Sequence, residues 1–229
     1  MSILVFGGNG QVGTELLRAA NGTDTVFAPR ERADFTDPAA CVALLEEIRP
    51  TAVLNAVAYT AVAQAEEEEE LATVINARTP GARAQAAAGI GAPFVHISTD
   101  YVFEGSGEQP WSVDALTAPL GAYGRSKLAG EDAVRAAGGS HAILRTSWVI
   151  SAHGRNFLKT MLRLGKERDR LTVVSDQIGG PTCAADIAAA CMTIAGALTS
   201  SGYKSGKYHF SGAPDVSWAE LSRAIFDMA

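Results

Sequence analysis

The feature that most constrains this chain is a strand-length apolar run followed at once by a glycine-rich turn. Residues 3–6 are apolar, and the stretch Gly7-Gly8-Asn9-Gly10-Gln11-Val12-Gly13 comes next. A helical pattern with Leu16 and Leu17 on one side follows the turn. Glycines at this spacing permit a tight turn and let backbone amides approach a pyrophosphate. Because the turn lies between a strand and a helix, it predicts a dinucleotide site.

Short apolar runs and longer amphipathic stretches continue to alternate along the chain. This alternation is typical of an α/β fold with a doubly wound parallel sheet, the Rossmann type. A helix is expected from the start signal Thr36-Asp37-Pro38 to about Ile48, and another at residues 71–88. After about Ser147 the pattern loosens, which suggests a smaller C-terminal lobe. Further strands are expected at residues 25–28, 52–54, 93–98, 141–146 and 171–174.

Composition narrows the class of protein. Of 229 residues, 47% are apolar, which favours a packed core over a disordered chain. The net charge is −6 and no cationic cluster is visible, so nucleic acid is not expected as a partner. No apolar run reaches the ~18 residues of a membrane span, so no membrane partner is expected and a cytoplasmic protein is the default. The three cysteines lack metal-ligand spacing and are interpreted as reduced core residues: Cys41, Cys183 and Cys191.

The only charge run is residues 66–70, five consecutive glutamates. It precedes the helix expected at residues 71–88, so we interpret it as a solvated run at the positive end of that helix. A metal site is not favoured, since oxygen ligands must converge from several directions. The loop at residues 104–119, which is rich in glycine and proline, is a candidate cover for a site.

The end of the second expected strand bears on the choice of dinucleotide. An acid there would bind the ribose 2′-hydroxyl, whereas a cation accommodates a 2′-phosphate. The chain reads Ala28-Pro29-Arg30-Glu31-Arg32, and Arg30 is closest to the expected place. NADPH is therefore favoured, with NADH left open. Asp34 and Phe35 are candidates to flank the adenine.

Tyr123 and Lys127 are four residues apart, on one face of an expected helix. A nearby ammonium favours phenolate and should lower the pKa of Tyr123 from its usual ~10 toward working pH. The strand-end sequence Ser98-Thr99-Asp100 precedes this pair. Hydroxyl, phenol and ammonium in this order match the constellation of the short-chain dehydrogenases/reductases, with Thr99 where serine is frequent.

Longer blocks sharpen the likeness, and together they extend from the first strand to about Trp218. These blocks are residues 98–105, Pro110-Trp111, residues 119–131, residues 145–149, Asn156-Phe157, residues 161–164, residues 175–177 and Gly180-Pro181-Thr182. In these blocks the chain resembles the dTDP-4-dehydrorhamnose reductases.

The resemblance implies a role for each matching residue. Tyr123 would be the catalytic acid, Lys127 would hold the nicotinamide ribose, and Thr99 would complete the catalytic set. Residues 1–147 would form the NADP(H)-binding domain, and residues 148–229 mostly an incomplete substrate-binding lobe, with some segments returning to the sheet. The expected cofactor contacts are Gly7, Gly10, Gln11, Val12, Gly13, Arg30, Asp34, Phe35, Ala58, Tyr59, Thr60, Tyr123 and Lys127. The expected substrate contacts are Thr99, Asp100, Tyr101 and Trp148.

The implied reaction is NADPH-dependent reduction of dTDP-4-dehydro-β-L-rhamnose to dTDP-β-L-rhamnose. Related dehydratases have a glutamate at the position of Tyr101 for elimination of water, so its absence favours reduction. Two alternatives stay open. One is another nucleotide-sugar reductase or an epimerase of the same superfamily, and the other is a non-catalytic, cofactor-binding regulatory subunit.

Some positions depart from the family pattern. Ala63 stands where aspartate is usual, and Ile150 where tyrosine is frequent. Glu15 matches one acidic position of a magnesium site at a dimer interface, but Ala185 replaces the second acid, so magnesium is not expected. Family members also continue beyond the helix that ends near Ala229, which bears on nucleotide-sugar affinity. The oligomeric state is left open, a homodimer included.

Overall fold

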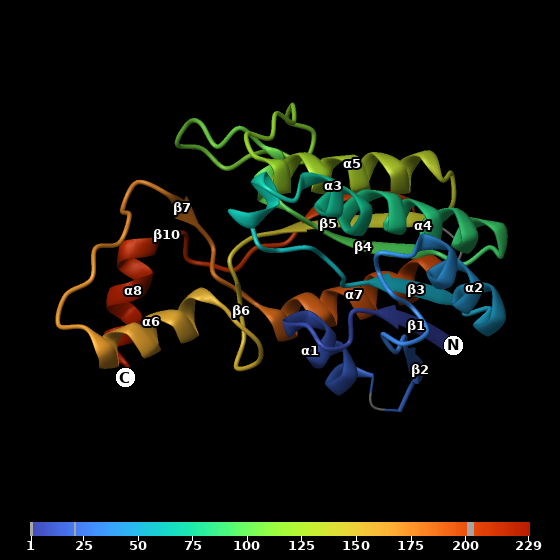
Figure 1. The fold of residues 1–229 in the computed structure, drawn as a ribbon, viewed down its shortest axis with the longest axis horizontal. Coiled ribbons are helices and arrows are strands. Elements are labelled where there is room, and N and C mark those ends of the chain that lie inside the picture. Colours follow the sequence, from blue (N-terminus) through green and yellow to red (C-terminus); the bar gives the residue numbers. More distant parts are fainter. Residues whose placement is uncertain (1, 21, 201–203) are drawn as a thin grey trace.

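The computed structural model describes residues 2–20, 22–200 and 204–229. Its centre is a parallel sheet whose strands run in the order β2-β1-β3-β4-β5-β9 (Figure 1). These strands are β1 (Ser2–Phe6), β2 (Asp24–Phe27), β3 (Ala52–Asn55), β4 (Phe94–Thr99), β5 (His141–Thr146) and β9 (Gly206–His209). The strand order doubles back at β1, which confirms the doubly wound parallel sheet expected from the sequence.

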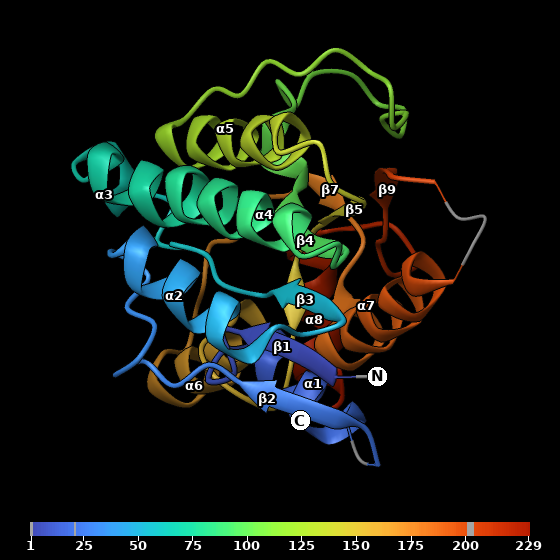
Figure 2. The same ribbon diagram turned by 90° about the vertical axis from the view of Figure 1, so that its right-hand side faces the viewer.

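Helices cover both faces of this sheet. Figure 2 shows α2, α4 and α5 on one side and α1 and α7 on the other. Leu4 and Phe6 of β1 pack toward α2 and α4, whereas Ile3 and Val5 pack toward α1 and α7, as the two-residue period of a strand requires. The helices are α1 (Gln11–Ala19), α2 (Pro38–Ile48), α4 (Thr79–Gly89), α5 (Ala122–Ala136) and α7 (Ala184–Thr199).

Helix α2 begins as the sequence predicts. The Asp37 carboxylate accepts hydrogen bonds from the amides of Ala39 and Ala40, and Pro38 occupies the first helical position. The helix expected at residues 71–88 begins earlier, with α3 (Glu69–Thr73), and continues through a π-helical turn (Val74–Arg78) into α4. A single-turn π-helix often marks a functional site.

The later part of the chain divides between the sheet and a separate group of elements. Helix α7 and strand β9 return to the sheet. Helices α6 (Phe157–Glu167) and α8 (Trp218–Asp227) lie beyond the carboxyl ends of the strands (Figure 1). Two short ladders accompany them: β6 (Val149–Ile150) with β8 (Thr182–Cys183), and β7 (Ile178–Gly179) with β10 (Val216–Ser217).

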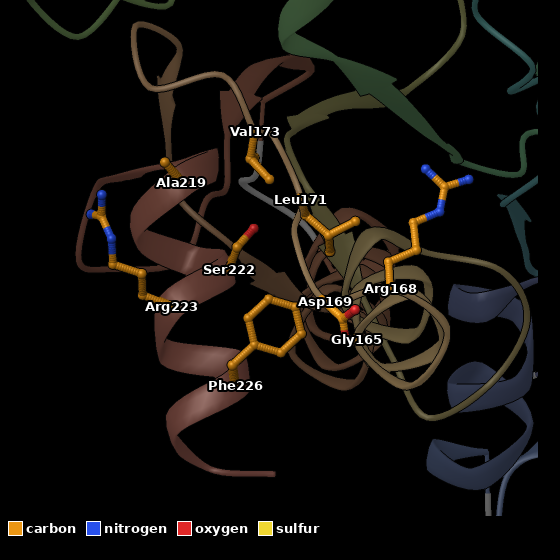
Figure 3. A pocket seen from close by; sticks show the side chains of 9 residues that line it. All are labelled: Gly165, Arg168, Asp169, Leu171, Val173, Ala219, Ser222, Arg223 and Phe226. Atoms are coloured by element: carbon orange, nitrogen blue, oxygen red, sulfur yellow. The ribbon is translucent and has the colours of Figure 1, made fainter.

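The expected strand at residues 171–174 is wrong. This segment is irregular, and its neighbour is helix α8 rather than another strand: the Ala219 amide donates to the Val174 carbonyl at 3.0 Å. Leu171 and Val173 line a cavity of about 430 Å³ together with Phe226, and all three side chains point into it (Figure 3). An apolar, β-branched sequence reads as a strand, but it pairs only where a sheet edge is available.

Within the described residues, no helix is long and apolar enough to cross a membrane.

Candidate active site

The glycine-rich turn between β1 and α1 tolerates no side chain at two positions. Gly7 has a φ of +97°, and a Cβ there would lie 2.8 Å from the carbonyl carbon of Ala56. A Cβ on Gly13 would lie 1.9 Å from the carbonyl oxygen of Gly7. Glycine is therefore required for α1 to begin tightly against the end of β1, as the motif predicts.

The N-terminus of α1 fits an anionic ligand. Its N-cap is Gly10, which provides no side-chain cap, and the first turn holds no acidic residue. The first amides of the helix, including those of Gln11 and Val12, have no partner within the helix, and the helix dipole adds positive potential there. Such an end binds phosphate readily. The expected dinucleotide contacts at this turn are thus chemically sound.

The segment after β2 contains the residues expected to determine whether NADPH or NADH is preferred. The Asp34 carboxylate accepts hydrogen bonds from the amide and hydroxyl of Thr36, at 2.8 and 2.7 Å. These bonds, and to a smaller extent nearby Arg30, lower the pKa of Asp34. Arg30 itself is exposed, and Phe35 is half-buried with the Arg83 guanidinium 5.0 Å from its ring centre. The proposed adenine contacts of Asp34 and Phe35 stay a prediction.

Ala58, Tyr59 and Thr60 follow β3 at the same end of the sheet. Asn76, in the π-helical turn, holds this segment: its side chain accepts from the Tyr59 amide at 2.8 Å and donates to the Tyr59 carbonyl at 3.1 Å. Asn76 also donates to the Ser126 hydroxyl on α5 at 2.9 Å. Sequence reasoning missed Asn76, because nothing local distinguishes it from an ordinary helical asparagine.

The end of β4 brings three polar side chains together. The Thr99 hydroxyl donates to the Asp100 carboxylate at 3.1 Å and accepts from the Tyr101 amide at 3.2 Å. Burial raises the pKa of Asp100. The Tyr101 ring meets the Tyr123 ring edge-on, with ring centres 5.5 Å apart. The structure therefore places Thr99, Asp100 and Tyr101 beside Tyr123, and their expected roles in catalysis and substrate binding stay a prediction.

Tyr123 lies in the first turn of α5, which approaches Tyr101 closely. A Cβ on Gly124 would lie 2.3 Å from the Tyr101 carbonyl oxygen, so glycine is required there. Burial raises the pKa of Tyr123 to about 12; the neighbouring Asp100 and Tyr101 act in the same direction, and a hydrogen bond with Thr99 acts against them. The expected lowering by Lys127 is wrong, since desolvation of the phenol outweighs the attraction assumed from their spacing.

Lys127 is almost completely buried, with 1% of its surface exposed. Its Nζ donates to the Ile97 carbonyl at 2.7 Å. Burial lowers the pKa of Lys127 to about 8, and the nearby Glu131 carboxylate opposes that shift. Lys127 thus lies one helical turn after Tyr123 in α5, with its ammonium against strand β4.

A buried ion pair lies between α5 and β5, and sequence reasoning missed it as well. Arg145 of β5 donates to both carboxylate oxygens of Glu131 on α5, at 2.8 and 2.7 Å. The Ser98 hydroxyl donates to the same carboxylate at 2.6 Å. Both charged side chains are at most 3% exposed. This bidentate pair fixes α5 against the sheet.

Trp148, expected to contact the sugar, has a φ of +46° and lies two residues after the end of β5. Its ring stacks on that of Trp218, with ring centres 3.4 Å apart and an interplanar angle of 12°. A Cβ on Gly179 would lie 2.7 Å from the Trp148 ring. The indole is therefore packed among β7 and α8, and its proposed contact with substrate stays a prediction.

The acidic run at residues 66–70 lies at the start of α3 and stays largely exposed, as expected, but it also makes contacts that the sequence did not predict. Glu66 and Glu69 contact the start of α5, Glu68 accepts from the Tyr59 hydroxyl at 2.6 Å, and Glu70 pairs with Arg78 at 2.7 Å. The bond to Glu68 raises the pKa of Tyr59 to about 12. These contacts could not be predicted from sequence because the partners lie up to 56 residues away.

No group of three metal-ligating side chains occurs in the part of the chain that the structure describes. Glu15 lies 3.2 Å from His153 Nε2 and 3.5 Å from Arg18.

A doubly wound sheet with a glycine turn at β1 and a Thr99–Tyr123–Lys127 set at the neighbouring strand ends defines a Rossmann-type protein of the short-chain dehydrogenase/reductase class. A family model, the RmlD substrate binding domain, matches residues 1–229. The chain is 43% identical to the dTDP-4-dehydrorhamnose reductase of Escherichia coli K12, covering 100% of this chain and 78% of the relative. It is 44% identical to the reductase of Burkholderia thailandensis, covering 98% and 77%. The chain belongs to the RmlD family of dTDP-4-dehydrorhamnose reductases.

Solved structures agree. A dTDP-4-dehydrorhamnose reductase from Clostridium acetobutylicum superposes with a TM-score of 0.93 at 36% identity, covering 100% of this chain and 80% of that one. A reductase from Bacillus anthracis in complex with NADP gives 0.92 at 38% identity, covering 99% and 80%.

Proposed function

We propose that this chain reduces dTDP-4-dehydro-β-L-rhamnose to dTDP-β-L-rhamnose with NADPH as the reductant, in the cytoplasm. The observation that carries the proposal is the 43% identity to the Escherichia coli reductase over the whole of this chain. The NADP complex of the Bacillus anthracis relative favours NADPH, and the exposed Arg30 after β2 is suited to a 2′-phosphate.

NADPH, when bound, supplies a hydride to the keto carbon of the sugar. The chain's own residues supply the rest of the chemistry. The Tyr123 hydroxyl gives a proton to the oxygen that gains negative charge, and the Thr99 hydroxyl, which donates its own proton to Asp100, adjoins that phenol. Lys127 adds positive charge near the reacting groups and lies firmly against β4 through its bond to Ile97.

The proposed substrate contacts are at the same end of the sheet. Asp100 and Tyr101 adjoin Tyr123, and their side chains would contact the sugar. Residues 148–229, apart from the returning α7 and β9, would bind the nucleotide-sugar, and residues 1–147 the dinucleotide. Loops and small elements beyond the carboxyl ends of strands are the usual place for ligands in such sheets.

The test is NADPH oxidation with the 4-keto sugar, generated in place by an upstream dehydratase and epimerase. We expect one NADPH consumed per sugar reduced, and a lower rate with NADH. Turnover of the sugar without net consumption of the dinucleotide would instead indicate an epimerase. Dinucleotide binding without any turnover would indicate a non-catalytic subunit.

A further inference from the structure

We infer that Glu66 is a positioning residue for Tyr123, acting through the first backbone amide of α5. The inference rests on the proposed role of Tyr123 as proton donor. Glu66 lies at the end of a 3₁₀ turn (Gln64–Glu66), far from Tyr123 in sequence but adjacent to it in the fold. Its Oε1 accepts a hydrogen bond from the amide of Ala122, the residue before Tyr123, at 2.8 Å.

Helix α5 needs this acceptor because its own sequence provides none. The N-cap is Gly121, which has no side chain, and the first turn holds no acidic residue. The first amides of a helix lack partners within the helix, and a side-chain oxygen that binds one typically contributes ~1 kcal/mol. A carboxylate also interacts favourably with the positive end of the helix dipole. Glu66 supplies both from a different segment of the chain.

Gly121 gives independent support, because its missing side chain makes room for the carboxylate. A Cβ at this position would lie 2.7 Å from Glu66 Oε1. The backbone of Gly121 has φ −110° and ψ 165°, which any residue can adopt, so conformation alone does not require glycine there. The space beside residue 121 is filled by the Glu66 carboxylate.

Apolar packing and an ion pair between Arg125 and Glu69 also hold the first turn of α5. Ala65, fully buried, forms a small apolar cluster with Ala72 and Ala122, and the Tyr59 and Tyr123 rings pack on that cluster. Two residues after Tyr123 in the sequence, Arg125 donates to both carboxylate oxygens of Glu69, at 2.8 and 3.0 Å, and lies 3.8 Å from Glu66. Contacts on residues 122 and 125 thus bracket the proton donor.

The first turn of α5 sets where the Tyr123 hydroxyl lies, so loss of the Glu66 bond should lower kcat rather than binding. A displacement of the order of 1 Å can cost about 100-fold in rate, and a partial loosening should cost less. We expect Glu66→Ala to lower kcat roughly tenfold, with KM for the sugar and the Kd for NADPH within about twofold of wild type.

Three variants and one control test this inference. Glu66→Gln keeps an oxygen that can accept from Ala122 and should recover most of kcat. Gly121→Ala keeps the carboxylate but forces its flexible end to shift, and should lower kcat less than Glu66→Ala does. Glu67→Ala removes an adjacent, exposed carboxylate of the same run and should match wild type. Rates are expressed per NADPH-binding site, so that unfolded protein does not enter kcat.

Hydrogen exchange of residues 121–127 gives a readout independent of activity. It should be faster in Glu66→Ala and Gly121→Ala than in wild type or Glu67→Ala. Equal exchange in all four proteins, or equal kcat for Glu66→Ala and Glu67→Ala, would overturn the positioning role. If wild type and Glu67→Ala fail to reduce the sugar, the proposed function fails, and the exchange data still decide whether Glu66 holds the turn.

Discussion

Tyr123 lies beside Thr99 and carries a proton that it can donate. A phenol whose pKa burial raises to about 12 holds its proton throughout the neutral range. An acid must be protonated before it can donate, and Tyr123 meets this condition, although a pKa this high also makes it a weaker acid. The spacing of Tyr123 and Lys127 alone suggested the opposite shift, because sequence cannot show how deeply a phenol is buried.

Removing the Tyr123 hydroxyl should abolish proton donation and leave the fold intact. For Tyr123→Phe we expect kcat to fall about 100- to 10,000-fold, the usual range for loss of a general acid. The Kd for NADPH, measured by fluorescence titration, should change little, because the phenyl ring still packs against Tyr101. An unchanged kcat would remove Tyr123 from the mechanism.

Lys127 predicts a pH dependence of stability. Below about pH 8, Lys127 is charged in both the folded and the unfolded protein. The cost of burying its charge then lowers the free energy of unfolding by its full amount. As the pH rises from about 8 to 10.5, the folded protein releases the proton that the unfolded chain still binds, so this cost is progressively relieved.

The free energy of unfolding of wild type minus that of Lys127→Met should therefore increase between pH 8 and 10.5, by ~1–3 kcal/mol at ~1.4 kcal/mol per pKa unit. Urea unfolding without NADPH measures it. A difference independent of pH would show that the lysine titrates normally. The hydrogen bond to Ile97 is lost in the variant and adds only a constant offset.

At the scale of elements, local signals predicted what depends on neighbours in sequence. The Asp37-Pro38 start of α2 and the strand at residues 141–146 are confirmed, because caps and strand periodicity lie within the segment itself. The buried pair of Glu131 and Arg145 could not be found this way. It joins a helix to a strand through contacts that depend on how the two pack.

Breaking the Glu131–Arg145 pair should strongly lower the free energy of unfolding, because the pair joins α5 to the sheet. Glu131→Ala leaves the Arg145 guanidinium buried without its partner, which should lower the free energy of unfolding by about 3–5 kcal/mol. The double variant Glu131→Leu/Arg145→Met should recover much of this loss. Glu167→Ala breaks an exposed pair with Arg163 on α6 and serves as the control, with an expected change under about 0.5 kcal/mol. Denaturant titration measures all three, and equal losses for Glu131→Ala and the control would contradict the prediction.

At the scale of the whole molecule, the alternation of strand and helix patterns in the sequence predicts the central sheet. It does not predict the elements that lie outside that sheet. The parallel order of strands was predictable because each βαβ unit carries its own pattern. The segment at residues 171–174, wrongly expected to be a strand, lies outside the sheet. Its neighbour there is helix α8, to which the Val174 carbonyl is hydrogen-bonded. The link between the two regions was equally invisible: Asn156 Nδ2 donates to Gln11 Oε1 at 2.8 Å across 145 residues.

Asn156 therefore connects the glycine turn to α6, and its two functions can be separated. Its Oδ1 caps α6 by accepting from the Lys159 amide at 3.0 Å, while its Nδ2 donates to Gln11 and, at 2.7 Å, to the Ser151 carbonyl. Serine is a good N-cap but is too short to reach Gln11, so Asn156→Ser should keep α6 and lose the link. Of the bonds that Nδ2 makes, the one to Gln11 bears on the dinucleotide, and its loss at ~0.5–1.5 kcal/mol corresponds to a roughly 2- to 12-fold weaker Kd for NADPH. Isothermal titration checks this, with Arg163→Ala on the exposed side of α6 as the control; wild-type affinity in Asn156→Ser would show that Gln11 needs no support from this link.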